Sequence, residues 1–197
     1  MNSIQEDTIG GFNSFLNDQR NEVGTATVTL CEFNDDVKLI YQSYPIAEAP
    51  KLDETTYTPG GRTALHDAIH RAVTETADDI KHLDAADRPN NVMVVVLTDG
   101  KENASETHQE RVREQVNVRR EEHDWEFLFI GANQDAALTA ESMGIDADKS
   151  LNMAQSGDGA QAAYESTSEQ VRQARQTGQA RGYSDADQQR QEDARDD

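Results

Sequence analysis

The sequence predicts an α/β fold in which a doubly wound, mostly parallel sheet carries helices on both faces. Two apolar runs, Val92–Leu97 and Trp125–Ile130, carry this prediction because neither alternates with polar residues. A strand without such alternation is buried on both faces, which is typical of the centre of a parallel sheet. Segments with helical periodicity separate the predicted strands, and strands that alternate with helices indicate a doubly wound sheet.

The N-terminal part predicts a helix followed by a hairpin. Apolar residues recur at helical spacing from about Ser3 to Arg20 and predict one amphipathic helix. The runs Thr25–Phe33 and Val37–Gln42 are rich in β-forming residues, and Asn34-Asp35-Asp36 lies between them. Turn-forming residues between two such runs predict an antiparallel hairpin.

Apolar residues at helical spacing and runs of β-forming residues predict the remaining elements. They are helices at Thr63 to Leu83, Thr107 to His123, Asp135 to Met143 and Gly159 to Gln176, and a short edge strand at Ser150 to Met153. After Gly178 almost nothing apolar remains except Tyr183, so residues 178–197 are predicted to form a disordered acidic tail. The expected organisation is one domain over residues 1–177, followed by that tail.

The charge balance is strongly acidic, with 38 Asp and Glu against 18 Lys and Arg, or a net charge of −20. A field of that sign repels nucleic acid and anionic membranes, so neither is an expected partner. The surplus spreads over every segment, which favours a salt-adapted, halophilic protein over an ordinary acidic one. Cys31 is the only cysteine and is expected to be a structural thiol on a strand. The longest apolar run is too short to cross a bilayer, and a cytoplasmic location is expected.

Two short motifs point to chemistry at one edge of the sheet. Asp99 follows the apolar run Val92–Leu97, at the end of a strand where α/β proteins bind ligands. A carboxylate there suits a hard cation, although a turn Asp that caps its own loop is an equally good interpretation. Thr63 follows Gly60-Gly61; it is either a plain helix N-cap or a hydroxyl that faces Asp99 across the sheet edge.

His66 and His70 stand four residues apart on a predicted helix, a spacing that can share a metal ion. The pattern lacks the Glu of zinc proteases and a third ligand downstream. A partly solvated flank of the helix is therefore the preferred interpretation, and no metal site is placed there.

The motifs, taken in order, resemble those of a von Willebrand factor A domain of microbial type, over about Met1 to Gln176. The segments that carry the resemblance are Thr8-Ile9-Gly10-Gly11-Phe12-Asn13, Phe33-Asn34-Asp35, Gly60-Gly61-Arg62-Thr63, Leu97-Thr98-Asp99-Gly100 and Gly131-Ala132-Asn133-Gln134-Asp135. The family binds proteins rather than catalysing reactions. The resemblance implies a metal-ion-dependent adhesion site for Mg²⁺ or Mn²⁺, completed by a carboxylate of a protein partner.

The resemblance places two of the family's metal ligands on Thr63 and Asp99. The other family ligands, an Asp-x-Ser-x-Ser after the first strand, have no counterpart in this chain. The implied strand order is 3-2-1-4-5-6, so the missing first strand would lie in the centre of the sheet. Two explanations stand open: a reading frame whose upstream part is absent, or a truncated protein that is completed by a partner's strand or is a remnant.

The motifs are compatible with three functions. The leading one is a protein-interaction module, which binds its partner through a divalent cation when the metal site is complete. Under this hypothesis the protein is not an enzyme. A metal-dependent phosphohydrolase that uses Asp99 is the competing class, but a second strand-end carboxylate and a positioned base are not evident. The third is a metal-free structural scaffold.

Overall fold

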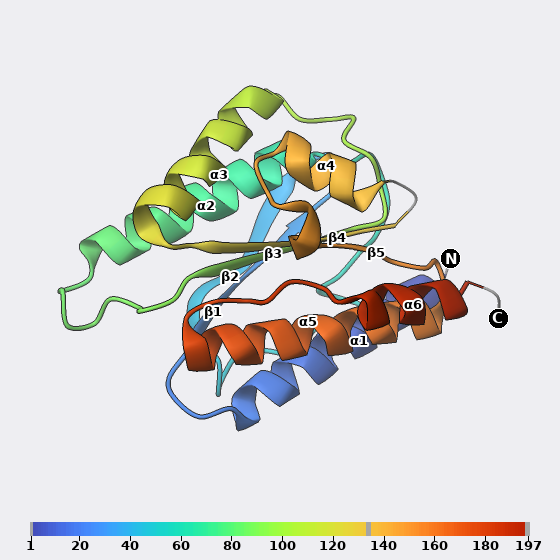
Figure 1. The fold of residues 1–197 in the computed structure, drawn as a ribbon, viewed down its shortest axis with the longest axis horizontal. Coiled ribbons are helices and arrows are strands. Elements are labelled where there is room, and N and C mark those ends of the chain that lie inside the picture. The colour runs from blue at the N-terminus through green and yellow to red at the C-terminus, as the bar shows by residue number, and fades with distance from the viewer. Residues whose placement is uncertain (1, 133–134, 196–197) are drawn as a thin grey trace.

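The computed structural model describes residues 2–132 and 135–195 and has an α/β architecture. Helices lie on both sides of the strands, with α2, α3 and α4 on one side and α1, α5 and α6 on the other (Figure 1). Asn133 and Gln134, which belong to a segment that carries the resemblance to a von Willebrand factor A domain, lie outside the described residues, as does Met1.

The helices and strands follow one another as the periodicities predict. The helices are α1 (Asn2–Asn21), α2 (Leu65–His82), α3 (Gln109–His123), α4 (Ala136–Ser142), α5 (Gly157–Thr177) and α6 (Asp185–Asp193). The strands are β1 (Thr27–Phe33), β2 (Val37–Pro45), β3 (Met93–Thr98), β4 (Glu126–Gly131) and β5 (Ser150–Asn152). All the predicted helices and strands are present, with boundaries shifted by a few residues.

The strands form two separate ladders among the described residues. β1 and β2 pair as an antiparallel hairpin, and β3, β4 and β5 form a parallel sheet in that order. The parallel sheet flanked by helices agrees with the predicted α/β class. The unalternating run of β3 predicts a place in the centre of a sheet, but β3 lies at the edge of this one, and its side chain Val95 is 39% exposed.

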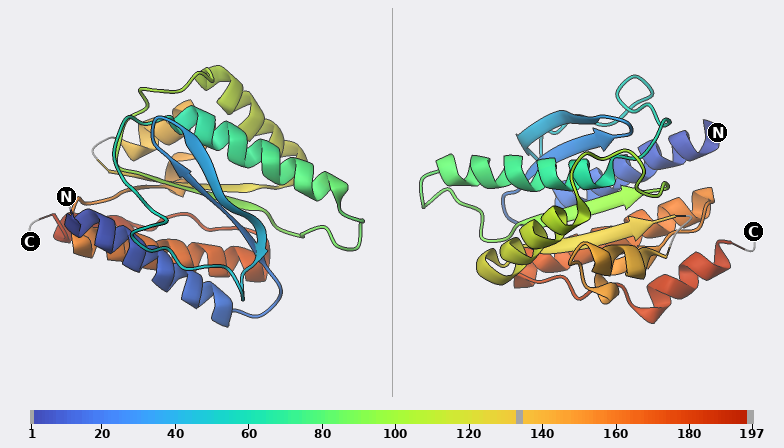
Figure 2. Two further views of the ribbon diagram at one scale, coloured as in Figure 1. Left: turned by 180° about the vertical axis from the view of Figure 1, so that it is seen from behind. Right: turned by 90° about the horizontal axis from the view of Figure 1, so that it is seen from above.

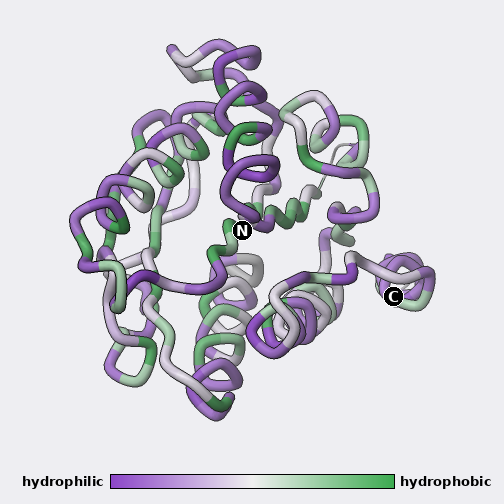
Figure 3. The backbone as a smooth tube through the Cα atoms, turned by 60° about the vertical axis from the view of Figure 1, so that its left-hand side comes forward, coloured by the Kyte–Doolittle hydropathy of each residue, from purple (hydrophilic) through white to green (hydrophobic). Residues whose placement is uncertain are grey.

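The core is divided by the parallel sheet. One cluster joins α2 and α3 to one face of the sheet through residues such as Ile69, Val112 and Phe129. A second joins α5 to the other face through Ile130 and Ala163. A third lies between α1 and the hairpin. Apolar residues concentrate along the inner strands and the inward helix faces, whereas the outer faces are hydrophilic (Figure 3).

Residues 178–195 do not form the disordered tail that their composition predicts. Tyr183 is 8% exposed and its hydroxyl lies 2.9 Å from Thr167 Oγ1. α6 begins with a capping box between Ser184 and Asp187. Gln191 is 1% exposed, accepts a hydrogen bond from Ala154 N at 2.8 Å and donates one to a carbonyl of α5. Composition misses this docking because buried polar side chains that bond to backbone anchor it, not a run of apolar residues.

Candidate functional site

Thr63 and Asp99, the two predicted metal ligands, are brought to one place at the C-terminal end of β3. Thr63 lies in the loop before α2, and Asp99 directly follows β3. A Cβ atom built on Gly100 would lie 2.2 Å from Thr63 Oγ1, so the hydroxyl of Thr63 packs against the residue next to Asp99. Asp99 itself is exposed. The hydroxyl of Thr63 therefore lies beside Gly100, the residue that follows Asp99.

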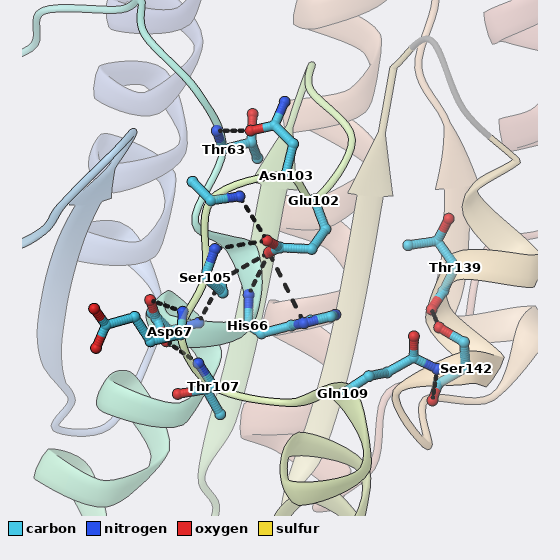
Figure 4. A network of polar contacts seen from close by, with 12 residues as sticks. Thr63, His66, Asp67, Glu102, Asn103, Ser105, Thr107, Gln109, Thr139 and Ser142 are labelled. Carbon is cyan, nitrogen blue, oxygen red and sulfur yellow. Dashed lines mark hydrogen bonds and ion pairs between the residues drawn. The ribbon is translucent and has the colours of Figure 1, made fainter.

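Asn103 fixes Thr63 in this position from the loop that follows Asp99. Thr63 N donates to Asn103 Oδ1 at 2.8 Å, and Asn103 N donates to Thr63 O at 3.0 Å (Figure 4). This reciprocal pair joins the segment before α2 to the segment after β3. The position of Thr63 thus depends on a contact between residues forty positions apart in the chain.

Thr63 is not the N-cap of α2. The helix begins at Leu65, and its N-cap residue Ala64 makes no side-chain capping bond. Glu102 Oε2 instead accepts the hydrogen bond of His66 N at 3.0 Å, and Ser105 Oγ accepts that of Asp67 N at 3.1 Å (Figure 4). Donors of a helix's first turn need partners from outside the helix. Here the loop after β3 supplies these partners, so the hydroxyl of Thr63 does not cap α2.

Glu102 is the centre of this loop's hydrogen bonding. Besides His66 N, its carboxylate accepts from the backbone of Ala104 and Ser105 and from Ser105 Oγ, at 2.7–2.9 Å. Burial raises the pKa of Glu102, but these hydrogen bonds to the charged form outweigh burial and hold the pKa below its usual value. The ionised carboxylate therefore stabilises the loop that presents Asp99 beside Thr63.

Asp67 ties the far end of the same loop to α2. Its carboxylate accepts from Glu106 N at 3.0 Å and Thr107 N at 2.8 Å (Figure 4). Burial raises the pKa of Asp67, and the hydrogen bonds from Thr107 and Glu106 lower it by more. Asp67 therefore has a structural role: it holds this loop against the start of α2.

His66 and His70 contact different neighbours. The ring of His70 lies 2.9 Å, at Nδ1, from Gln115 Oε1 on α3, whereas Nδ1 of His66 lies 4.0 Å from Glu102 Oε2. Both side chains are half-buried. The two rings contact different neighbours, as the interpretation of a helix flank predicts.

A narrow cleft opens beside Asp99 at the C-terminal ends of β3 and β4. Its walls come from the first helix, the strand ends and α5; they include Asp7, Thr8, Leu97, Asp99, Ala132 and Tyr164. Tyr57 is close to this group: burial raises its pKa, the negative charge of Asp99 raises it further, and a hydrogen bond with Thr8 lowers it. Sequence reasoning did not place Asp7, Thr8 or Tyr57 at the site, because only the packing of α1 and of the segment before α2 brings them to the strand ends.

The fit of a divalent cation to these residues is partial. Mg²⁺ takes an octahedral shell of oxygen ligands, and the candidate site offers the hydroxyl of Thr63 and the carboxylate of Asp99. Within residues 2–132 and 135–195, no three His, Cys, Asp or Glu side chains come together as a metal-binding group. A cation held by Thr63 and Asp99 would therefore need further oxygen ligands beyond these two side chains.

In the part of the chain that the structure describes, no helix combines the length and apolar character needed to span a membrane. Comparisons of the chain with protein-family models, with curated proteins and with solved structures gave no match. The case for any function accordingly rests on the geometry of Thr63, Asp99 and the loop that holds them.

Proposed function

We propose that this chain is a protein-interaction module of the von Willebrand factor A type, which binds a partner protein through a divalent cation. Thr63 and Asp99 would hold one side of the cation, and a carboxylate of the partner would help complete its shell. The observation that carries the proposal is the contact of the Thr63 hydroxyl with Gly100, next to Asp99. Asp99 and Thr63 lie where ligands bind in open α/β sheets, at the carboxyl ends of parallel strands.

The loop from Asp99 to Thr107 supports a binding role because several hydrogen bonds hold it in place although it lies at the surface. Glu102 and Asp67 together accept backbone hydrogen bonds along it, and Asn103 bonds to Thr63 in both directions. A site whose side chains are positioned by a second set of contacts loses less entropy on binding. This arrangement favours the recognition of a ligand at Asp99.

A magnesium titration of the thermal midpoint tests the metal part of the proposal. With few protein ligands, we expect millimolar affinity; a tenfold excess over Kd would stabilise the protein by about 1.4 kcal/mol. That corresponds to a rise of roughly 3–6 °C in Tm for a chain of this size. Ionic strength is held constant with KCl, because an acidic protein also gains stability from nonspecific screening.

The variants Asp99→Ala and Thr63→Ala separate specific binding from screening. Both should abolish the rise in Tm. Asp87→Ala is the matched control, since Asp87 is exposed in the loop before β3, at the opposite end of that strand. An equal response of Asp99→Ala and Asp87→Ala to magnesium would reject the cation site.

The competing enzymatic function is distinguished by turnover. A phosphohydrolase that uses Asp99 would hydrolyse a generic phosphoester such as p-nitrophenyl phosphate, and Asp99→Asn would lose that activity. The interaction module predicts no turnover above the buffer rate in either protein. A metal-free scaffold predicts neither turnover nor a magnesium response.

A further inference from the structure

The helices α1 and α5 lie side by side and begin at the same end of the molecule (Figure 2). Near their starts, a Cβ atom built on Gly157 would lie 3.0 Å from Asp7 Oδ2. Further along, Gln19 Nε2 donates to Ser168 O at 3.1 Å. The N-terminal parts of the two helices therefore form opposite walls of the cleft at the C-terminal ends of β3 and β4.

The inside of this cleft is apolar, whereas its rim is acidic. All the buried residues of its lining are apolar: Ala132, Met153, Ala154 and Ala160. The two carboxylates of the lining belong to Asp7, which is half-buried, and to Asp99, which is exposed. A cation that binds here therefore has its charge at the rim and can place an apolar group inside.

The inside of the cleft is also small. Its volume is about 20 Å³, and one water molecule needs roughly 10–15 Å³. A group of about that size, such as a methyl group, fits this space, whereas a Leu or Phe side chain does not.

Asp7 brings a carboxylate that has no partner among residues 2–132 and 135–195. Both of its oxygens lie against the first residue of α5, within 3.0–3.2 Å of the place that a Cβ on Gly157 would take. In the described part of the chain its side chain forms no hydrogen bond or ion pair. A partly buried charge without a partner is unfavourable, and a cationic ligand would remove that cost.

Tyrosine hydroxyls lie close to the carboxylates. Burial raises the pKa of Tyr164, which lines the cleft, and the neighbouring Tyr57 raises it further. The ring of Tyr164 packs against Gly11, and its hydroxyl makes no hydrogen bond within the described residues. A phenol oxygen accepts hydrogen bonds. The cleft therefore offers carboxylate and phenol oxygens to a ligand that donates several hydrogen bonds.

The order of these features favours an α-ammonium group over a basic side chain. A Lys ammonium stands at the end of four methylene groups, so insertion of that side chain would place its charge inside the apolar part. An Arg guanidinium is a planar fork, larger than the space inside. A polypeptide that begins with Ala carries its ammonium and a methyl group on one carbon. Its α-amino group has a pKa of about 7.7–8.0 and is mostly protonated at neutral pH.

We propose that this cleft binds the amino terminus of a partner polypeptide whose first residue is Ala. The α-ammonium donates to Asp7, Asp99 and the hydroxyl of Tyr164, and the methyl group lies inside the cleft. Capture of a chain terminus is a recurrent mode of peptide recognition, and the net charge of −20 attracts a cationic terminus. This inference goes beyond the proposed cation site and does not depend on it. Because Asp99 belongs to both sites, a bound divalent cation should weaken binding of the amine.

The test uses the full chain in EDTA at constant ionic strength, so its result is independent of the magnesium titration. The probe is the peptide Ala-Gly-Ser-Gly amide, and binding is followed by the NMR chemical shifts of the amides of Thr8, Ala132 and Ala160. We expect saturable shifts. Acetylation of the amino terminus removes its charge and should weaken binding by roughly tenfold or more. Leu as the first residue should also weaken it by roughly tenfold, because the space inside is too small.

Three results with these peptides would overturn the proposal. The first is the absence of saturable shifts with the free Ala peptide. The second is equal affinity for the peptide that begins with Leu, which would show that the inside of the cleft is not used. The third is equal affinity for an acetylated peptide with an internal Lys, which would show that any amine suffices.

Variants of the protein give the second readout. Asp7→Asn should weaken binding of the Ala peptide by roughly tenfold, because it removes the unpartnered carboxylate. Tyr164→Phe keeps the ring against Gly11 and should weaken binding by about threefold through loss of one acceptor. Glu6→Gln is the matched control, since Glu6 is the exposed neighbour of Asp7 on α1 and does not line the cleft. Circular dichroism establishes that the variants fold, and equal binding by Asp7→Asn and Glu6→Gln would overturn the proposal.

Discussion

Glu102 caps a helix that begins nearly forty residues before it: its Oε2 accepts the hydrogen bond of His66 N at 3.0 Å, on the first turn of α2. The same carboxylate accepts three hydrogen bonds from its own loop. One side chain therefore joins the start of α2 to the loop that carries Asp99. Stability of the domain and presentation of the candidate site are coupled through this residue.

Replacing Glu102 by Gln should destabilise the protein at neutral pH and not in acid. The pKa of Glu102 is lower in the folded state than its usual value of 4.5, so its contribution is present above that pH. It is lost as the pH falls through the folded-state pKa. We expect Glu102→Gln to cost about 1–2 kcal/mol at pH 7, as loss of a helix cap does, and much less near pH 3.

Urea unfolding of the wild type and Glu102→Gln at both pH values measures this difference. Glu106→Gln is the control, since Glu106 is an exposed carboxylate on the same loop. A destabilisation by Glu102→Gln that is equal at pH 7 and pH 3 would show that the carboxylate's charge is not responsible.

The adjacent glycines of α1 should respond in opposite directions to substitution by Ala. A Cβ on Gly10 meets nothing within 4 Å, whereas a Cβ on Gly11 would lie 2.1 Å from the ring of Tyr164. Gly10→Ala should stabilise the protein by about 0.5–1 kcal/mol, because Ala has the higher helix propensity. Gly11→Ala should destabilise it by about 1–3 kcal/mol through overpacking. Thermal midpoints of both variants decide this, and a shift of the same sign would contradict the packing of α1 on α5.

Tyr183 should be essential to stability although it lies in the segment whose composition predicts disorder. Its ring is 8% exposed within the α5 cluster, and its hydroxyl contacts Thr167. Tyr183→Ala should cost about 3–5 kcal/mol, and Tyr183→Phe about 1 kcal/mol. The control Gln189→Ala changes an exposed residue of α6. A neutral Tyr183→Ala in denaturant unfolding would mean that residues 178–195 are not docked in solution.

Salt should stabilise this protein strongly if its acidic surface is an adaptation to salt. The net charge is −20, and repulsion among like charges opposes folding. The screening length falls from about 10 Å at 0.1 M salt to 3 Å at 1 M. The thermal midpoint should therefore rise steadily as KCl increases from about 0.1 M to 2 M. Sucrose at equal osmolality is the control, and a midpoint that does not respond to KCl would reject salt adaptation.

The sequence alone predicts the elements of this fold because their signals are local. Helical periodicity and turn-forming residues are properties of neighbouring residues, so the hairpin β1–β2, the strands β3 and β4 and each helix before residue 178 are predicted at nearly their observed positions. The position of Asp99 at the carboxyl end of a parallel strand is also predicted, because Asp99 directly follows the apolar run of β3.

Only the tertiary structure decides what caps α2, what docks α6 and which strand of the parallel sheet lies at its edge. Glu102 with His66 and Gln191 with Ala154 are hydrogen bonds between residues more than thirty positions apart. No local pattern encodes such pairs, because each depends on how the whole chain closes. The exposure of Val95 likewise follows from the position of β3 at the edge of the parallel sheet, which the residues of the strand do not determine.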